Sequence, residues 1–323
     1  MRILLIIMLI SFTQLGNAQV TDSLSQLLDN EMSVNAKPVE KEKNIAVFKG
    51  TQLVNSRTTE TLKKHQLDFR IGHKFGDMGG EFGGEKSFFG LENSTDVKIG
   101  FDYGITNRLT VGIGRAKGAT SVRQLYELGL KYKLLQQKTD GSFPFTVTLF
   151  GNAVVSSMAS NAKANTPDHF ENFNDRMSYT GQLLIGRKFS DFFSLMLMPT
   201  YVHTNYVIHN DQNDIFAAGI GARVKLSKHF GIVADYFKVF RGQTSIDRFK
   251  AAGLKFYDPL GVGIEIETGG HVFDFNFTNS TALLENQFIP YTTSSWKGGH
   301  FRWAFNMSRI FSLKKNKKQT NKL

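Results

Sequence analysis

The sequence predicts an all-β protein, a transmembrane antiparallel up-and-down β-barrel of about 12 strands. Apolar and polar residues alternate with a period of two in segment after segment. Short turns alternate with long polar loops along the chain, as they do in outer-membrane barrels. After the N-terminus, no segment approaches the ~20 apolar residues that a membrane-spanning helix needs. Any membrane insertion is therefore expected to use strands.

The N-terminus is predicted to carry a signal peptide over residues 1–18. Arg2 precedes an apolar run at residues 3–10, and small residues follow at 16–18. The alternative is a buried first helix. With the signal peptide, the mature protein is expected to be exported to the cell outer membrane. The next segment, residues 19–64, is polar and weakly patterned, and is expected either to stay periplasmic as a loose arm or to plug the barrel.

The clearest strand pattern lies in residues 96–115. Apolar side chains occupy alternate positions from Val97 to Tyr103, and lysine, aspartate and glycine occupy the positions between them. Thr106 and Asn107 form a tight turn, after which the alternation resumes at Leu109. This pattern predicts a β-hairpin with one face toward lipid and the other toward a wet lumen.

The same alternation continues through residues 65–311, which we predict to be the barrel domain. Both termini are expected on the periplasmic side, because the strand number is even. A basic periplasmic tail over residues 312–323 would follow the aromatic last strand, which resembles an insertion signal for the barrel-assembly machinery. The other predicted strands are residues 67–75, 126–133, 143–155, 177–189, 192–203, 215–226, 230–239, 262–267, 273–278 and 301–311.

The polar face of these strands argues against the main alternative, a soluble β-sandwich or jelly roll. It combines glycine with charges of both signs, which suits a lumen in which opposite charges pair across strands. The residues expected to line this lumen are Asp68, Arg70, Lys98, Asp102, Glu127, Lys131, Glu265, Glu267 and Asp274.

Composition excludes several other classes of function. The formal net charge is +11, but part of it belongs to a lysine-rich tail without aromatic residues, so we expect no nucleic-acid partner. The chain has no cysteine, which excludes disulfides, thiolate metal sites, a cysteine nucleophile and a bacterial lipid anchor on cysteine.

Some residue clusters permit catalytic or metal chemistry, but none has a diagnostic spacing. The glycine-rich stretch at residues 76–84 lacks the Lys-Ser/Thr of a phosphate loop. Paired carboxylates such as Glu265 and Asp274 can bind Ca²⁺ or transfer protons, but balanced lumen charges are the simpler interpretation. We expect no catalytic residues, no metal and no cofactor. The remaining candidates are His203, His209 and Asp211 for a metal, and Ser178, Ser194 and His203 for a hydrolase.

Aromatic girdles are expected where the barrel crosses the two lipid interfaces, because amphipathic rings favour the headgroup level. The residues assigned to them are Tyr179, Tyr201, Tyr291 and Trp303.

Three stretches resemble a family of outer-membrane β-barrels of Bacteroidetes-type bacteria, the domain of unknown function 5777. They are residues 48–76, residues 87–117, and residues 260–280 with the sequence LGVGIEIETGGHVFDFNFTNS. The resemblance covers nearly all of the mature chain and implies an outer-membrane barrel. It carries no catalytic or ligand-binding residues.

These observations predict a non-enzymatic outer-membrane barrel that is either a narrow pore for small polar solutes or a structural or docking element. One alternative is a barrel enzyme that acts on lipid or peptide at the rim. Another is a binding module that uses the loops at residues 156–176 and 280–299. The expected partners are outer-membrane lipid, the barrel-assembly machinery and an unidentified periplasmic or extracellular protein.

Overall fold

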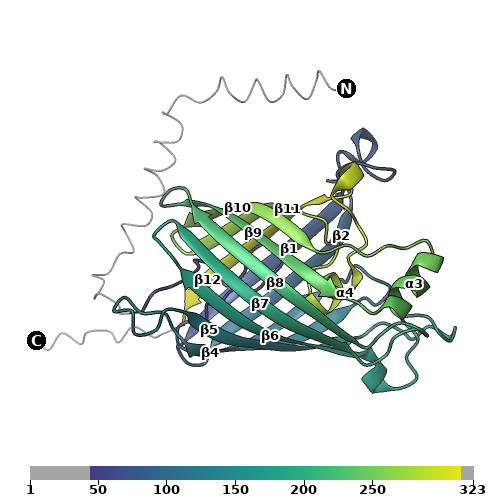
Figure 1. The fold of residues 1–323 in the computed structure, drawn as a ribbon, viewed down its shortest axis with the longest axis horizontal. Helices are drawn as coiled ribbons and strands as arrows, with labels where there is room; N and C mark the ends of the chain where they lie inside the picture. Colours follow the sequence, from purple (N-terminus) through teal and green to yellow (C-terminus); the bar gives the residue numbers. More distant parts are fainter. Residues whose placement is uncertain (1–43, 314–323) are drawn as a thin grey trace, which may run out of the picture. The chain divides into compact units, whose positions relative to one another are not determined.

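The computed structural model describes residues 44–313, which form one closed barrel of twelve antiparallel strands (Figure 1). Each strand pairs with its neighbours in sequence, and the last strand closes on the first. The predicted fold class is confirmed. The strands are β1 (Gln66–Asp77), β2 (Ser94–Gly104), β3 (Leu109–Ala116), β4 (Leu125–Leu135), β5 (Thr146–Ser156), β6 (Met177–Lys188), β7 (Phe193–Thr204), β8 (Asp214–Lys225), β9 (Phe230–Phe240), β10 (Leu260–Thr268), β11 (His271–Thr278) and β12 (Arg302–Ser312).

The predictions for residues 1–43 and 314–323, including the signal peptide and most of the tail, lie outside the described residues. Within residues 44–313, no helix is both long enough and apolar enough to cross a membrane.

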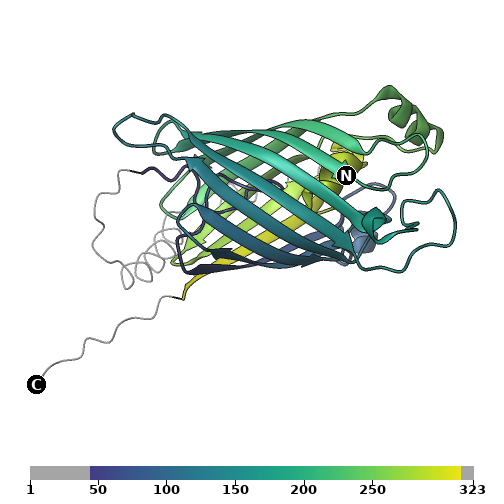
Figure 2. The same ribbon diagram turned by 90° about the horizontal axis from the view of Figure 1, so that it is seen from below.

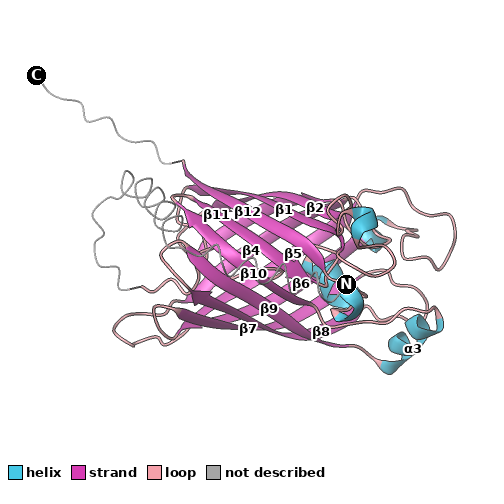
Figure 3. Cartoon of the chain, turned by 90° about the horizontal axis from the view of Figure 1, so that it is seen from above, coloured by secondary structure: helices cyan, strands magenta, loops and turns pink. Residues whose placement is uncertain are grey.

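The two ends of the barrel differ in the length of their connections. Tight turns join β2 to β3, β6 to β7, β8 to β9 and β10 to β11 at one end, which we call the short-turn end. The other end, the long-loop end, carries the helices (Figure 3). Figure 2 shows one of them, α3, beyond the ends of the strands. The helical elements are η1 (Glu85–Ser87), η2 (Phe173–Arg176), α3 (Gln243–Ala251), α4 (Glu285–Tyr291) and η3 (Lys297–Gly299).

The outward face of the barrel is apolar, as the alternation predicts. On β4, Leu128 and Leu130 are 62% and 50% exposed, whereas Glu127 and Lys131, which flank this pair, are 7% and 5% exposed. A band of exposed leucine, isoleucine and phenylalanine around a closed barrel is the surface that a membrane barrel presents to lipid.

Residues 44–64 form a hairpin inside the lumen, which we call the lumen hairpin. It begins at the short-turn end, where Ile45 N donates to Gln137 O at 2.8 Å. It reverses direction where Leu53 N donates to Ser56 O at 2.8 Å, and its side chains from Val47 to Leu62 are mostly buried. Its last residues continue directly into β1, so the hairpin is covalently attached to the barrel at the short-turn end.

The loop between β11 and β12 fills the other half of the lumen. Its residues 280–291, which include α4, fold into the barrel from the long-loop end and are called the outer plug. Leu284, Phe288 and Ile289 are at most 1% exposed. The helix α4 contacts β6, β7 and β9.

The inner wall is apolar on one side, which the alternation did not predict. Met196 and Met198 on β7 point inward and are fully buried, although the outward positions of the same strand are also apolar. They pack with Leu53 and Val54 of the lumen hairpin and with Phe288 of the outer plug. The lumen hairpin therefore has an apolar contact surface toward β6 to β9.

Replacing Gly261, on the inward face of β10, should disturb the lumen hairpin. A Cβ atom there would lie 2.3 Å from Cγ1 of Val54 and 2.7 Å from Nδ2 of Asn55. We expect Gly261→Ala to destabilise the folded barrel by about 1–3 kcal/mol, the usual cost of overpacking. The midpoint of heat-induced unfolding, followed by the mobility shift on a gel, measures this. Gly129→Ala, with its nearest neighbour at 3.6 Å, is the control. Equal midpoints for the two variants would contradict the prediction.

Candidate functional site

Arg57 lies where the lumen hairpin meets the outer plug. Its guanidinium nitrogens are 2.9 Å from Glu127 Oε1 of β4 and 3.2 Å from Glu285 Oε1 of α4. A third carboxylate, Asp102 of β2, lies 3.7 Å away. The same guanidinium stacks 5.0 Å from the ring centroid of Phe150. One buried cation thus joins the wall, the hairpin and the plug.

The tip of the lumen hairpin is held by Asp235 of β9. This carboxylate accepts hydrogen bonds from the backbone N–H groups of Asn55 and Ser56 at 2.6 and 2.8 Å, and from Asn55 Nδ2 at 2.8 Å. Bonds to an ionised acceptor are stronger than neutral ones. If the hairpin left the lumen, Asp235 would lose these three hydrogen bonds, and water would have to replace them.

Lys74 of β1 is a second link between the two internal segments. Its ammonium donates to Asn55 Oδ1 at 2.7 Å, to Ser280 Oγ at 3.0 Å and to Ala282 O at 2.6 Å. All three hydrogens of this buried ammonium are therefore used, one on the hairpin and two on the outer plug.

The space left between these segments is too small for a continuous aqueous path. A cavity lined by Gln52, Arg57 and Glu285 has a volume of about 20 Å³, and another beside Lys131 and Phe150 has about 10 Å³. A single water needs roughly 10–15 Å³. In this conformation the lumen is closed at its centre.

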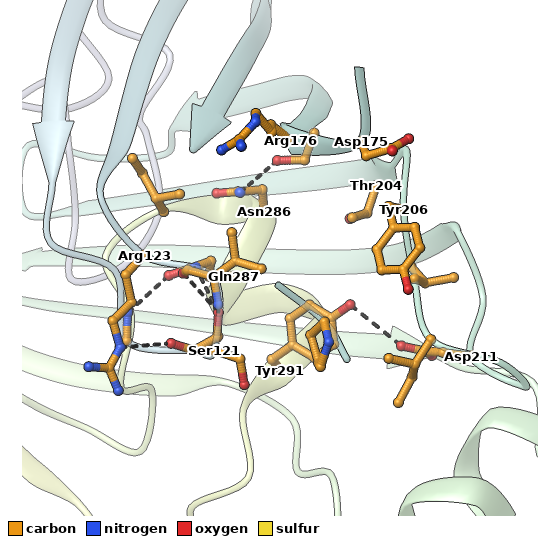
Figure 4. A pocket seen from close by; sticks show the side chains of 18 of the residues that line it. Ser121, Arg123, Asp175, Arg176, Thr204, Tyr206, Asp211, Asn286, Gln287 and Tyr291 are labelled. Carbon is orange, nitrogen blue, oxygen red and sulfur yellow. Dashed lines mark hydrogen bonds between the residues drawn. The ribbon is translucent and has the colours of Figure 1, made fainter. Parts of the chain in front are cut away.

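A larger pocket of about 440 Å³ lies above the closure at the long-loop end (Figure 4). Loops from five of the six long connections contribute to its walls, and a volume of this size suits a small molecule. The lining mixes aliphatic, aromatic, hydroxyl and amide groups, with Arg123, Arg176, Asp175 and Asp211 as balancing charges. Its polar and aromatic lining includes Thr120, Ser121, Phe170, Ser178, Thr204, Tyr206, Phe249, Phe256, Asn286, Gln287 and Tyr291.

The helix α4 forms part of this pocket, so the outer plug has one side in the lumen and another facing the pocket. Asn286 Nδ2 donates to Ser178 Oγ at 2.7 Å, and its Oδ1 is buried without a hydrogen-bond partner. Gln287 Nε2 donates to Thr120 Oγ1 at 2.8 Å and to Val122 O at 2.6 Å. A polar molecule in the pocket would therefore lie beside the element that closes the lumen.

The far wall of the pocket is organised by Asp211. It accepts hydrogen bonds from Arg241 at 2.7 Å and from Ser245 of α3 at 2.6 Å. The Tyr291 hydroxyl lies 3.5 Å from the same carboxylate. Burial, together with this carboxylate, raises the pKa of Tyr291 above its usual range, so the phenol stays a neutral donor. The prediction that Tyr291 joins an aromatic girdle is wrong, because it lies at the end of α4.

All nine residues expected to line the lumen lie on the inward faces of the strands, where most of them contact the lumen hairpin or another wall charge. Arg70 pairs with Asp102, and Lys98 with Glu127. Lys131 donates to three carbonyl oxygens of the hairpin. Their role in a pore remains a prediction. Asp68 accepts a hydrogen bond from the Thr51 hydroxyl. Glu265 forms an ion pair with Arg223, and Glu267 forms one with Lys49. Asp274 is buried, and its Oδ1 has no hydrogen-bond partner within residues 44–313.

The candidate hydrolase residues are not brought together. Ser194 is near the beginning of β7 and donates to Val47 O of the lumen hairpin, whereas His203 is near the end of the same strand. Ser178 points inward to Asn286, on the opposite face from His203.

The candidate metal residues also separate. His203 pairs with Asp214 at 2.7 Å, and Asp211 pairs with Arg241. The backbone of His209 donates to Asn165. No group of three or more His, Asp or Glu side chains within residues 44–313 is arranged to hold a metal ion.

Breaking the contacts of Arg57 should release the lumen hairpin. In Arg57→Met, three carboxylates lose a cation, and the loss of one partner of a buried pair typically costs about 3–5 kcal/mol. Buried Ser56 can report the release as Ser56→Cys, because the chain has no other cysteine. We expect a water-soluble maleimide to label it roughly tenfold faster or more in the Arg57→Met background.

The matched control adds Glu285→Gln to Arg57→Met, which neutralises the carboxylate that has no other ion pair within residues 44–313 and keeps the methionine beside the reporter. Labelling should slow again toward the parent rate. Equal labelling rates with and without Arg57 would show that this residue does not hold the hairpin.

Comparison with known proteins places the chain among membrane barrels. No curated protein matches the sequence. Among solved structures it is similar to the NanC porin, with 8% identity, a TM-score of 0.45 and coverage of 76% of this chain and 98% of that one. The KdgM porin is 9% identical, with a TM-score of 0.45 and coverage of 76% of this chain and 99% of that one. An outer membrane channel from Pseudomonas putida F1 is 11% identical, with a TM-score of 0.43 and coverage of 78% of this chain and 98% of that one.

Similarity of this degree does not transfer the function of those channels to this chain. The sequence profile of the membrane bound beta barrel domain family, DUF5777, matches residues 48–311. This match covers most of the chain, and the protein therefore belongs to that family of membrane-bound β-barrels.

Proposed function

We propose that the protein is a non-enzymatic outer-membrane channel for small polar solutes, closed at rest by the lumen hairpin and the outer plug. The observation that carries this proposal is that neither internal segment is a strand of the barrel. The ladder from β1 to β12 is complete without them. Their removal would leave the wall intact and expose the charged inward faces of β1, β2 and β4, as in the polar interior of a porin, beside the apolar inward face of β7.

The chemistry of the contacts supports a closure that opens rather than a permanent core. Much of the hairpin is held by Asp235, Lys131 and the carboxylates around Arg57. Buried ion pairs often contribute less stability than apolar packing of the same volume. Charged groups also regain much of their solvation when water replaces the hairpin.

The pocket at the long-loop end supplies the first binding step in this proposal. A solute there contacts Asn286, Gln287 and Tyr291, all on α4. Binding shifts a conformational equilibrium only if the ligand has different affinities for the two states. A solute that binds the pocket better when the outer plug has moved would therefore favour opening.

A reducible lock tests whether the lumen hairpin is the barrier. A Cβ atom at Gly186 of β6 would lie 3.3 Å from Thr59 Oγ1 and 2.9 Å from its Cγ2. The double variant Thr59→Cys/Gly186→Cys can therefore close a disulfide between hairpin and wall, and no native cysteine interferes. It is built in the Arg57→Met background, and single-channel current is recorded in a planar bilayer before and after reduction.

We expect the oxidised protein to be silent and the reduced protein to conduct in discrete steps. Thr59→Cys with Arg57→Met, treated with the same oxidant, is the control and should conduct throughout. If the oxidised and the reduced protein conduct equally, the lumen hairpin is not the barrier. Silence under all conditions, in protein that shows the heat-dependent gel shift of a folded barrel, would refute the channel and favour a closed structural barrel.

A further inference from the structure

A second cavity at the long-loop end lies at the rim of the barrel, where β9 ends. Its volume is about 960 Å³. One side is the end of β9, a second is the β9–β10 loop with α3, and the back is formed by Ile289 and Pro290. Figure 1 shows α3 and this loop beyond the ends of β9 and β10. The cavity adjoins the pocket above the lumen, with which it shares Leu254 and Phe256, and Arg241 contributes to the organisation of both.

The cavity has exposed lysines on its lining. Lys250 at the end of α3 and Lys255 in the following loop are both exposed, and no ion pair within residues 44–313 includes either of them. The other two cations of the cavity are already used, since Lys238 pairs with Asp258 at 3.0 Å and Arg241 with Asp211. Residues 238–258 contain five Lys or Arg and two Asp, so the whole loop carries an excess of positive charge.

The same cavity exposes large apolar side chains. Phe240 at the end of β9, Ile246 of α3 and Leu254 in the following loop are 55%, 37% and 45% exposed. The Lys255 ammonium lies 5.3 Å from the ring centroid of Tyr257 in the same cavity. Scattered apolar exposure needs no explanation, but a group that lines one hollow beside cations without an ion pair is a binding surface for an amphiphile. The cations would contact its anionic head, and the apolar residues its tail.

The position of the cavity identifies the amphiphile. Lys238 and Phe240 lie on the outward, lipid-facing face of β9, and Phe240 pairs in register with the exposed Phe216 of β8. The hollow therefore begins where the apolar outer surface ends and the polar loops start. In a membrane this level contains lipid headgroups, whose phosphates complement a basic loop.

We propose that this cavity binds one phosphorylated lipid of the membrane leaflet at the long-loop end. The phosphate lies between Lys250 and Lys255, and an acyl chain runs along Phe240, Ile246 and Leu254. The inference rests on the membrane orientation in the proposed function, but not on conduction. Because Ile289 and Pro290 of the outer plug form the back of the cavity, a bound lipid would contact the element that closes the lumen.

The test measures lipid binding directly on the full chain in detergent. The probes are lipopolysaccharide that carries its lipid A phosphates, the same material after phosphatase treatment, and inorganic phosphate. Lys250→Ser/Lys255→Ser is compared with Lys86→Ser/Lys163→Ser, two exposed lysines on other loops of the same end. Retention of lipid is followed by native mass spectrometry, and folding by the heat-dependent gel shift.

We expect the Lys250/Lys255 variant to bind the phosphorylated lipid about tenfold or more weakly, since it lacks both charged contacts to the phosphate. The control variant should bind like the parent, and dephosphorylated lipid should bind the parent and the Lys250/Lys255 variant equally weakly. Salt should weaken retention of the phosphorylated lipid by the parent more than that of the dephosphorylated one, a measurement that needs no variant.

Three results would overturn the proposal. Equal affinity of the Lys250/Lys255 variant and the parent for the phosphorylated lipid would show that these two lysines do not contact the phosphate. Equal affinity of the parent for both lipid forms would reduce the surface to non-specific apolar contact. Competition by millimolar inorganic phosphate would identify a free-anion site instead of a lipid site. Since none of these measurements records current, they separate failure of the lipid site from failure of the channel.

Discussion

The insertion of Arg57 among three carboxylates is the interaction on which the closed lumen depends. Glu127 and Asp102 project from a wall that strand alternation fixes, so their charges cannot leave the interior. In an empty lumen water would solvate them, but in a filled one a cation must. The wall itself supplies Lys98 to Glu127 and Arg70 to Asp102, and the lumen hairpin adds a further cation at its turn, together with N–H donors for Asp235. The hairpin can occupy the barrel because it satisfies the charges that it covers.

The two internal segments depend on each other through the same groups. Arg57 contacts Glu285 at the start of α4, and Lys74 donates to both the hairpin and the outer plug. Displacement of the outer plug would remove one carboxylate from Arg57 and two acceptors from Lys74. A buried ammonium with one acceptor instead of three is strongly destabilised. Opening at the long-loop end would therefore weaken the closure from the short-turn end, although no backbone connects the two segments directly.

Strand alternation predicted the wall because every wall residue has one of two environments, lipid or lumen. The hairpin has no such periodicity, since each of its residues meets a different strand, and its polar sequence resembles a loose arm. One signal was nevertheless present. On β7 the inward positions include Met196, Met198 and Val202, and the outward positions are apolar as well. A strand that is apolar on both faces needs an apolar partner inside the barrel, and Leu53 and Val54 are that partner.

The outer pocket was beyond sequence reasoning for a different reason. Its lining comes from loops whose mutual positions depend on single contacts, such as Arg241 with Asp211 and Gln287 with Thr120. No periodicity relates those pairs, which are 30 and 167 positions apart in the sequence. Yet the fold restricts where such a pocket can form. Because the lumen hairpin enters from the short-turn end and α4 fills the space that remains, a solute from the long-loop end must meet α4 first. The solute contact that we propose and the closure of the lumen thereby fall on the same seven-residue helix.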